Sequence, residues 1–223
     1  VWMGEVEQLE RWMGANNKQT VTSLVASPKP DWTIYDLTQD YRDLALKAVE
    51  AGSRIVEFNF SCPNVASSEG SIYKNPKDCK TICKAAKEAL PDDARLLIKV
   101  GHSTKEEYRE LLEQTSPYID GIVAINTIPV KVIDEKGHQA LPGGLVSGVC
   151  GRAILDYAID AVKSLVELRG EMMLDIKIIG CGGITTPESF IEHINAGADY
   201  ALVATAALFI PDLPLQVARY LQR

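Results

Sequence analysis

The stretch IVEFNFSCPN, residues 55–64, carries the features from which both the fold and a candidate site can be argued. Its first half is a short continuous apolar run, which is typical of a strand buried on both faces. Its second half places a thiol, a hydroxyl and two carboxamides within six residues, and Pro63 pushes Cys62 towards an extended conformation. The amides can present donors and acceptors to a planar ligand, and only the thiol can exchange a proton near neutral pH. We therefore expect a strand that ends in a reactive turn.

The rest of the chain repeats an order of strand, loop and helix. Short apolar runs predict strands at 20–26, 55–60, 96–100, 121–125, 177–180 and 200–204. Helices are expected at 5–13, 38–50, 76–90, 152–168, 187–195 and 214–223, and a capping box at 103–106 predicts a helix to Thr115. The segment 129–151 is loop-like, with a small hairpin of its own.

This order predicts an α/β fold in which helices cover a parallel sheet. A (β/α)₈ barrel of the TIM type needs eight strands, and six are identifiable in this chain. The chain is therefore either such a barrel without its first two strands or an open doubly wound sheet. We expect one domain over residues 1–223, because this length suits a single core.

Composition and charge exclude several classes of protein. The apolar content of 46% and charged content of 24% are those of a globular protein. A net charge of −7 argues against a nucleic-acid surface. No apolar run approaches the ~20 residues of a membrane span, and the N-terminal residues lack the pattern of a signal peptide. We expect a cytoplasmic protein that binds neither nucleic acid nor membrane.

The five cysteines predict neither disulfides nor a metal site. Their number is odd and no CxxC pair occurs, so a disulfide framework, a zinc site or an iron–sulfur site is not indicated. Cys79 and Cys83 stand four apart on an expected helix and are interpreted as packing residues. For a lone cysteine such as Cys62 a buried structural role is the simpler interpretation, but its polar neighbours favour a functional one.

The ends of the expected strands carry polar, small or reactive residues: 59–64, Lys99, Asn126-Thr127, 180–183 and Ala204-Thr205. In a parallel barrel these ends meet at one face, so one shared site is expected. Gly182-Gly183 would let backbone N–H groups approach an anion, and the helix from Pro187 would add its positive end. Lys99 could stabilise charge on a flavin, form a Schiff base, or extend to solvent as an ordinary surface lysine.

From about Thr20 to its C-terminus the chain resembles the dihydroorotate dehydrogenase family, specifically the soluble class 1 enzymes. The hexapeptide NFSCPN resembles the family's signature after the fourth barrel strand, with Cys where class 2 enzymes have Ser. Residues 148–152, GVCGR, resemble the Gly-x-Ser-Gly flavin loop, for which Gly143-Gly144 is an alternative alignment. Residues 180–184 and 204–206 resemble the two loops that bind the FMN phosphate.

The resemblance implies FMN-dependent oxidation of (S)-dihydroorotate to orotate in pyrimidine biosynthesis. Cys62 would be the base that removes the C5 proton while hydride passes from C6 to FMN. The implied substrate-binding residues are Asn59, Asn64, Asn126 and Thr127. The implied FMN-binding residues are Lys99, Gly148, Gly151, Cys181, Gly182, Gly183, Ala204 and Thr205. The implied partners are a second copy in a homodimer and, for transfer to NAD, an iron–sulfur/FAD electron-transfer subunit; fumarate is the other acceptor.

Alternative functions remain open at this level. The family's first two strands have no counterpart here, so a preceding segment or another chain supplies them, or the protein is a catalytically inert relative. A dehydrogenase of another dihydropyrimidine would share most of the site, although Asn64 favours orotate because those relatives typically carry His there. A phosphate-binding barrel lyase that forms a Schiff base on Lys99 would leave the Asn-Cys-Asn cluster unexplained.

Overall fold

The computed structural model describes residues 2–29, 31–62, 71–142 and 146–222. Six parallel strands form one sheet in the order β1-β2-β3-β4-β7-β8. Their bounds are β1 Thr22–Leu24, β2 Ile55–Asn59, β3 Arg95–Val100, β4 Gly121–Ala124, β7 Lys177–Cys181 and β8 Tyr200–Leu202. All six coincide with the apolar runs that predicted them.

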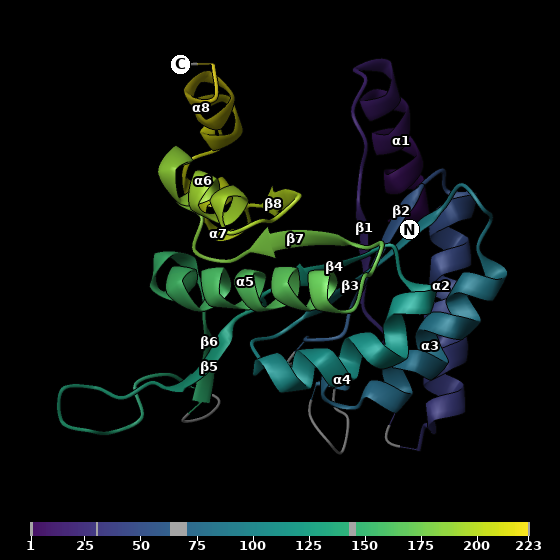
Figure 1. The fold of residues 1–223 in the computed structure, drawn as a ribbon, viewed down its shortest axis with the longest axis horizontal. Helices are drawn as coiled ribbons and strands as arrows, with labels where there is room; N and C mark the ends of the chain where they lie inside the picture. The colour runs from purple at the N-terminus through teal and green to yellow at the C-terminus, as the bar shows by residue number, and fades with distance from the viewer. Residues whose placement is uncertain (1, 30, 63–70, 143–145, 223) are drawn as a thin grey trace.

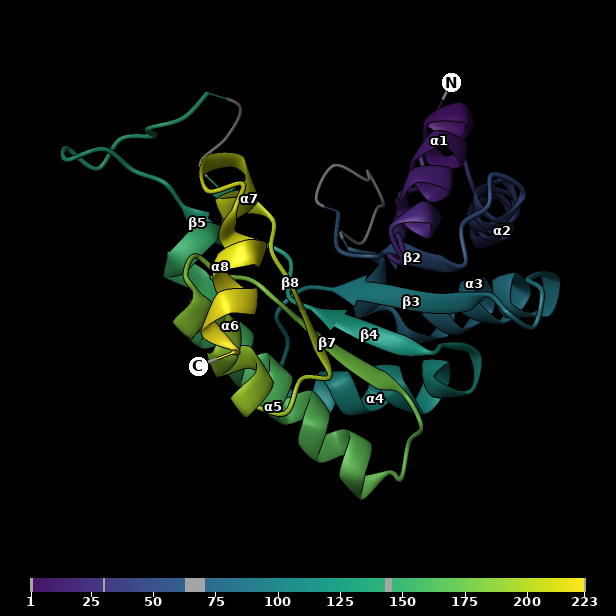
Figure 2. The same cartoon turned by 90° about the horizontal axis from the view of Figure 1, so that it is seen from above.

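The strand order decides between the two architectures that the sequence left open. A doubly wound sheet reverses its strand order at a switch point, whereas in a barrel each strand lies beside its predecessor. Here successive parallel strands are neighbours throughout, and β1 and β8 form the two edges of the sheet. The chain is thus an α/β half-barrel of the TIM type, and Figures 1 and 2 show the curled sheet with its helices.

The helices follow the strands as expected. Their bounds are α1 Trp2–Ala15, α2 Ile34–Glu50, α3 Pro76–Ala89, α4 Lys105–Thr115, α5 Leu155–Glu171, α6 Pro187–Asn195, α7 Thr205–Phe209 and α8 Leu213–Tyr220. Asn75 caps α3 with Pro76 at its first position, as predicted. The capping box of α4 was predicted one residue too early: it joins Thr104 to Glu107, because the N-cap side chain must reach the N–H three residues on.

The two faces of the sheet bury different sets of side chains. Alternate strand residues such as Phe58, Ile98 and Ile122 belong to the main core, which packs against the helices. The intervening residues Leu97, Val123, Ile179 and Cys181 form a separate apolar cluster on the concave inner face. On that inner face Ser23 Oγ donates a 2.6 Å hydrogen bond to the buried carboxylate of Glu57. The inner face therefore becomes polar towards β1 and β2.

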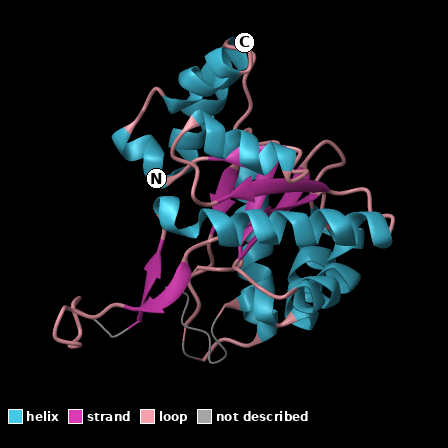
Figure 3. Cartoon of the chain, turned by 60° about the vertical axis from the view of Figure 1, so that its left-hand side comes forward, coloured by secondary structure: helices cyan, strands magenta, loops and turns pink. Residues whose placement is uncertain are grey.

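A hairpin and short 3₁₀ turns lie between the strands and helices of the described residues; one such turn, η2 Ser116–Tyr118, follows α4. The expected hairpin consists of β5 Ile128–Lys131 and β6 Val146–Val149, which pair antiparallel and project from the body of the molecule (Figure 3). A 3₁₀ turn, η3 Gly151–Ile154, leads into α5, and another, η1 Ile72–Lys74, precedes α3. The short helix α7 was not predicted. No helix in the described ranges is long and apolar enough to cross a membrane.

Candidate active site

The carboxyl ends of four strands are joined by backbone hydrogen bonds. Asn59 and Lys99 are register partners, so their side chains leave the same, inner face of β2 and β3. Beyond this pair, the N–H of Phe60 donates to Lys99 O at 3.0 Å, and the N–H of Asn126 donates to Val100 O at 3.0 Å. The N–H of Ile125 donates to Cys181 O at 2.6 Å. The strand ends that the sequence singled out thus form one continuous edge.

Ser61 connects two of the predicted substrate-binding residues. Its N–H and its hydroxyl donate to Asn59 Oδ1 at 3.3 and 3.1 Å. The Nδ2 group of Asn126 donates to the carbonyl and the hydroxyl oxygen of Ser61, each at 2.9 Å. Asn126 Oδ1 in turn accepts the N–H of Thr127 at 2.8 Å. Asn59, Asn126 and Thr127 are therefore held in one hydrogen-bonded cluster.

Cys62 follows Ser61 directly in the chain and is half-buried. Asn64, predicted to bind substrate, lies outside the described residues, as does the alternative flavin loop at Gly143-Gly144. Cys181 is buried on the inner face, and this burial raises the pKa of its thiol. The positive charge of Lys99, whose side chain leaves the same inner face, acts on the pKa of Cys181 in the opposite direction.

The predicted cofactor-binding glycines lie where neighbouring segments approach closely. A Cβ on Gly148 would stand 2.5 Å from Thr127 Oγ1, so the hairpin packs against the amide cluster. Gly151 has a φ of +73°, and a Cβ there would stand 3.9 Å from the Thr205 methyl group. Gly182 and Gly183 have φ of +118° and +77°, and a Cβ on Gly183 would stand 2.4 Å from Leu155 Cα. The loops at 148–151, 182–183 and 204–205 thus surround the start of α5.

Backbone donors in these loops suit an anion. The described hydrogen bonds include none donated by the N–H groups of Gly182 or Gly183. Thr205 is the first residue of α7, whose N-cap Ala204 makes no side-chain hydrogen bond. By contrast, the capping box of Thr186 and Ser189 already occupies donors at the start of α6. The N–H groups of Gly182, Gly183 and Thr205 are therefore donors suited to an anion such as a phosphate.

Sequence reasoning missed several residues that shape the site. Ser61 was noted only as one polar group of the hexapeptide, and His193, whose Nε2 lies 2.9 Å from Gly182 O, was given no role. Two tyrosines hold the loop after Lys99: Tyr108 donates to Gly101 O at 2.8 Å, and Tyr73 donates to His102 O at 3.4 Å. No local sequence pattern marks these residues, because their contacts depend on how the loops after the strands fold back.

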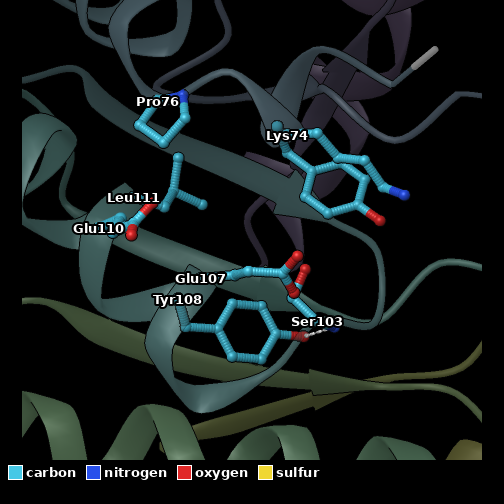
Figure 4. Close-up of a pocket in the computed structure, with 8 residues that line it drawn as sticks. Lys74, Pro76, Ser103, Glu107, Tyr108, Glu110 and Leu111 are labelled. Carbon is cyan, nitrogen blue, oxygen red and sulfur yellow. Dashed lines mark hydrogen bonds between the residues drawn. The ribbon is translucent and has the colours of Figure 1, made fainter. Parts of the chain in front are cut away.

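Figure 4 shows the small pocket beside these tyrosines, in which Ser103 N donates to Tyr108 Oη at 3.2 Å. Its lining residues come from η1, the start of α3, the loop before α4 and α4 itself: Tyr73, Lys74, Pro76, Ser103, Glu107, Tyr108, Glu110 and Leu111. None of the predicted substrate or cofactor residues lines it. The pocket therefore belongs to the packing behind the strand ends and is separate from the candidate site.

The family model that describes dihydroorotate dehydrogenase matches residues 6–221, almost the whole chain. The chain belongs to the dihydroorotate dehydrogenase family. A dihydroorotate dehydrogenase of Dictyostelium discoideum is 37% identical over 187 residues, which are 82% of this chain and 50% of that protein. The catalytic subunit of dihydroorotate dehydrogenase B (NAD(+)) from Methanocaldococcus jannaschii is 30% identical over 174 residues, 77% of this chain and 53% of that subunit.

A solved structure agrees with the fold of this family member. The crystal structure of DHODH from Eimeria tenella in complex with ferulenol superposes with a TM-score of 0.74 at 17% identity. The match covers 99% of this chain and 64% of that one. The chain thus spans about half the length of the curated relatives it matches.

Proposed function

We propose that this chain forms the catalytic part of an FMN-dependent enzyme that oxidises (S)-dihydroorotate to orotate in pyrimidine biosynthesis. The observation that carries the proposal is the hydrogen-bonded cluster of Asn59, Ser61 and Asn126, with Cys62 next to it and Lys99 in register with Asn59. Amides, a thiol and an ammonium group at one edge suit a flat, polar, anionic ring better than a sugar phosphate. The family membership supports the same activity.

In the proposed reaction the chain's own groups bind, orient and deprotonate. The amides of Asn59 and Asn126 hold the ring, with Thr127 and Asn64 assigned to the same task. The thiolate of Cys62 removes the proton from C5 of dihydroorotate. Bound FMN would accept the hydride that leaves C6. Lys99 would supply positive charge at the inner face, where negative charge develops on the isoalloxazine ring.

The remaining assigned residues would position the cofactor. Gly182, Gly183 and Thr205 would donate backbone N–H groups to its phosphate, with Ala204 and Gly151 beside them. Cys181 and Gly148 would lie against the ring system, because Cys181 ends β7 on the inner face and Gly148 packs on Thr127. Their roles are positional: none supplies a proton or a bond in the reaction.

We also propose an electron-transfer partner. Seven curated relatives carry the name of a B (NAD(+)) catalytic subunit, which is the name of one component of a larger enzyme. An iron–sulfur/FAD subunit that passes electrons to NAD would suit such a component, and a homodimer of catalytic chains would be its core. Sedimentation of the full protein with and without such a subunit tests this assignment.

The deciding experiment is the visible absorption spectrum of the full purified protein, recorded before and after dihydroorotate is added without oxygen. Flavin bands that bleach would support both cofactor and reaction. If the flavin bands persist with dihydroorotate but bleach with dihydrouracil, the substrate is another dihydropyrimidine and not dihydroorotate. A protein that binds no FMN would contradict the proposal, and borohydride trapping of a carbonyl substrate on Lys99 would then identify a lyase.

A further inference from the structure

Ser61 fixes the orientation of two side-chain amides through groups that cannot exchange roles. A backbone N–H only donates and a backbone carbonyl only accepts. The Ser61 N–H, 3.3 Å from Asn59, therefore requires the oxygen of that amide. The Ser61 carbonyl, 2.9 Å from Asn126, requires the nitrogen of that amide, and the Thr127 N–H at 2.8 Å requires its oxygen. Asn59 consequently faces Ser61 with its amide oxygen, and Asn126 faces Ser61 with its amide nitrogen.

The serine hydroxyl completes the same pattern. It donates its hydrogen to Asn59 Oδ1 at 3.1 Å and accepts from Asn126 Nδ2 at 2.9 Å. Ser61 is only 6% exposed, so water cannot easily replace these partners. One buried residue thereby links side chains that stand on β2 and just beyond β4.

The hydrogens and lone pairs that the two amides have left determine what each can offer to a ligand. Asn126 Nδ2 has two hydrogens, and the carbonyl and hydroxyl oxygens of Ser61 take both. Asn126 therefore has only the second lone pair of Oδ1 to offer. Asn59 Oδ1 already accepts two hydrogen bonds, while its Nδ2 has no hydrogen-bond partner among the described residues. Asn59 can therefore only donate to a ligand, and Asn126 can only accept.

We propose that Ser61 is a positioning residue that sets this polarity and so selects a ligand with an acceptor at Asn59 and an N–H donor at Asn126. A pyrimidine ring that alternates carbonyl and N–H groups satisfies both demands, whereas a ring with carbonyl groups at both places would leave the Asn126 oxygen facing another acceptor. The inference rests on the proposed function for its ligand. The orientation of the two amides is independent of any ligand.

The ligand test compares three serine variants of the full protein by titration with orotate. Ser61→Ala removes the hydroxyl and should raise the Kd for orotate about tenfold, which corresponds to ~1.4 kcal/mol, with FMN content unchanged. Ser61→Thr keeps the hydroxyl and should restore the Kd to within about threefold of the original. Ser61→Ala with an unchanged Kd would overturn the proposal.

Ser53→Ala is the matched control. Ser53 is fully buried before the other end of β2, where its hydroxyl donates to Ile55 O at 3.1 Å and accepts from Thr22 Oγ1 at 2.9 Å. Its removal should lower the melting temperature about as much as Ser61→Ala does, with no change in the Kd for orotate. Equal losses of orotate affinity in both variants would reduce Ser61 to a structural role and overturn the inference.

A second measurement needs no ligand and separates this inference from the proposed function. Asn59→Asp keeps an oxygen opposite the Ser61 N–H and hydroxyl, so it should leave the melting temperature within a few degrees. Asn126→Asp places an oxygen against the Ser61 carbonyl, so that two acceptors face each other. This variant should lower the melting temperature clearly more than Asn59→Asp does. Equal or reversed shifts would overturn the assigned polarity even if orotate binds. The expected shifts together with absent orotate binding would overturn the function and leave the amide orientation standing.

Discussion

His193 Nε2 lies 2.9 Å from the carbonyl oxygen of Gly182, so a side chain of α6 supports the turn that follows β7. His193 is fully buried, and its Nδ1 is a buried side-chain atom without a hydrogen-bond partner in the described chain. Nε2 must donate to the carbonyl, which makes Nδ1 the unprotonated nitrogen. A neutral imidazole thus holds the loop to which we assign the FMN phosphate.

Acid should weaken the folded state through this contact. Burial lowers the pKa of His193, so below its ordinary value of about 6.5 the unfolded chain binds a proton that the folded chain does not. The contribution of His193 is therefore present above that pH and is lost as the pH falls. His193→Leu should cost about 1–3 kcal/mol at neutral pH and flatten the dependence of unfolding free energy on pH.

Urea unfolding at about pH 7.5 and pH 5.5 measures this effect, because the two values bracket the titration of free imidazole. His138→Gln is the control, since His138 is exposed on the loop between β5 and β6. Because the 3.6 Å contact of His138 with Asp134 is exposed, this variant should change the free energy of unfolding by less than about 0.5 kcal/mol at either pH. A His193→Leu variant that retains the original pH dependence would refute the assignment.

Asp199 should be the most important carboxylate for joining β7, β8 and α5. Its side chain accepts the Ile178 N–H at 2.8 Å and pairs with Arg169 Nη1 at 2.5 Å. Burial alone would raise the pKa of Asp199, but the Ile178 N–H and Arg169 outweigh it, and the pKa is lowered. Asp199 therefore stabilises the folded state above a pH of about 3.9, the ordinary pKa of an aspartate. This stabilisation is lost as the pH falls from that value through the lowered pKa of the folded state.

Asp199→Asn should reduce the free energy of unfolding by about 1–3 kcal/mol at neutral pH. Lys177→Gln is the comparison, because Lys177 reaches the same carboxylate only at 3.7 Å and its side chain is 57% exposed. That variant should change stability by less than about 0.5 kcal/mol. Chemical denaturation of both variants checks the difference, and similar losses would show that the Ile178 and Arg169 contacts do not dominate.

Cys62→Ala should abolish reduction of the flavin by dihydroorotate and leave flavin content unchanged. The reason is that Cys62 carries the only thiol of the hexapeptide 59–64, and alanine cannot accept the C5 proton. Cys83→Ala is the control: Cys83 is fully buried on α3, so this variant should lose some stability and keep its rate of reduction. Stopped-flow absorbance without oxygen measures both. An unchanged rate in Cys62→Ala would remove Cys62 as the base.

Gly183→Ala should destabilise the protein far more than Gly137→Ala, although both glycines have positive φ. The φ values are +77° and +82°, so the backbone penalty of about 1–2 kcal/mol is shared. A Cβ on Gly183 would meet Leu155 Cα at 2.4 Å, whereas nothing lies within 4 Å of one on Gly137. We expect a loss of about 3 kcal/mol or more against about 1–2 kcal/mol. Thermal unfolding distinguishes them, and equal losses would exclude the contact with α5.

Much of the fold could be predicted, because its signals are local. Each strand is a short apolar run, and Asn75-Pro76 marks the start of α3 through hydrogen bonds made within one turn. The repeated strand–helix pattern predicted a parallel sheet but left its strand order open, and the structure shows successive parallel strands side by side. The short helix α7 escaped prediction because its five residues carry neither a capping side chain nor an apolar period.

The candidate site could be predicted as a set of residues but not as an arrangement. Strand ends that follow apolar runs identify Asn59, Cys62, Lys99 and Asn126, and the sheet brings Asn59, Lys99 and Asn126 to one edge. Gly183 was predicted to bind the cofactor because a glycine lets backbone N–H groups approach an anion closely. The structure adds a packing reason, because Leu155 lies where a side chain would stand.

The sequence by itself determined where the strands lie and which reactive residues end them, since both depend on neighbours within a few positions. Only the tertiary structure decided which atoms those residues present. Ser61 and Asn126 are 65 positions apart, and His193 reaches Gly182 across 11. Such contacts exist only after the sheet has placed distant segments side by side. The donor and acceptor pattern of the site is therefore a property of the folded chain.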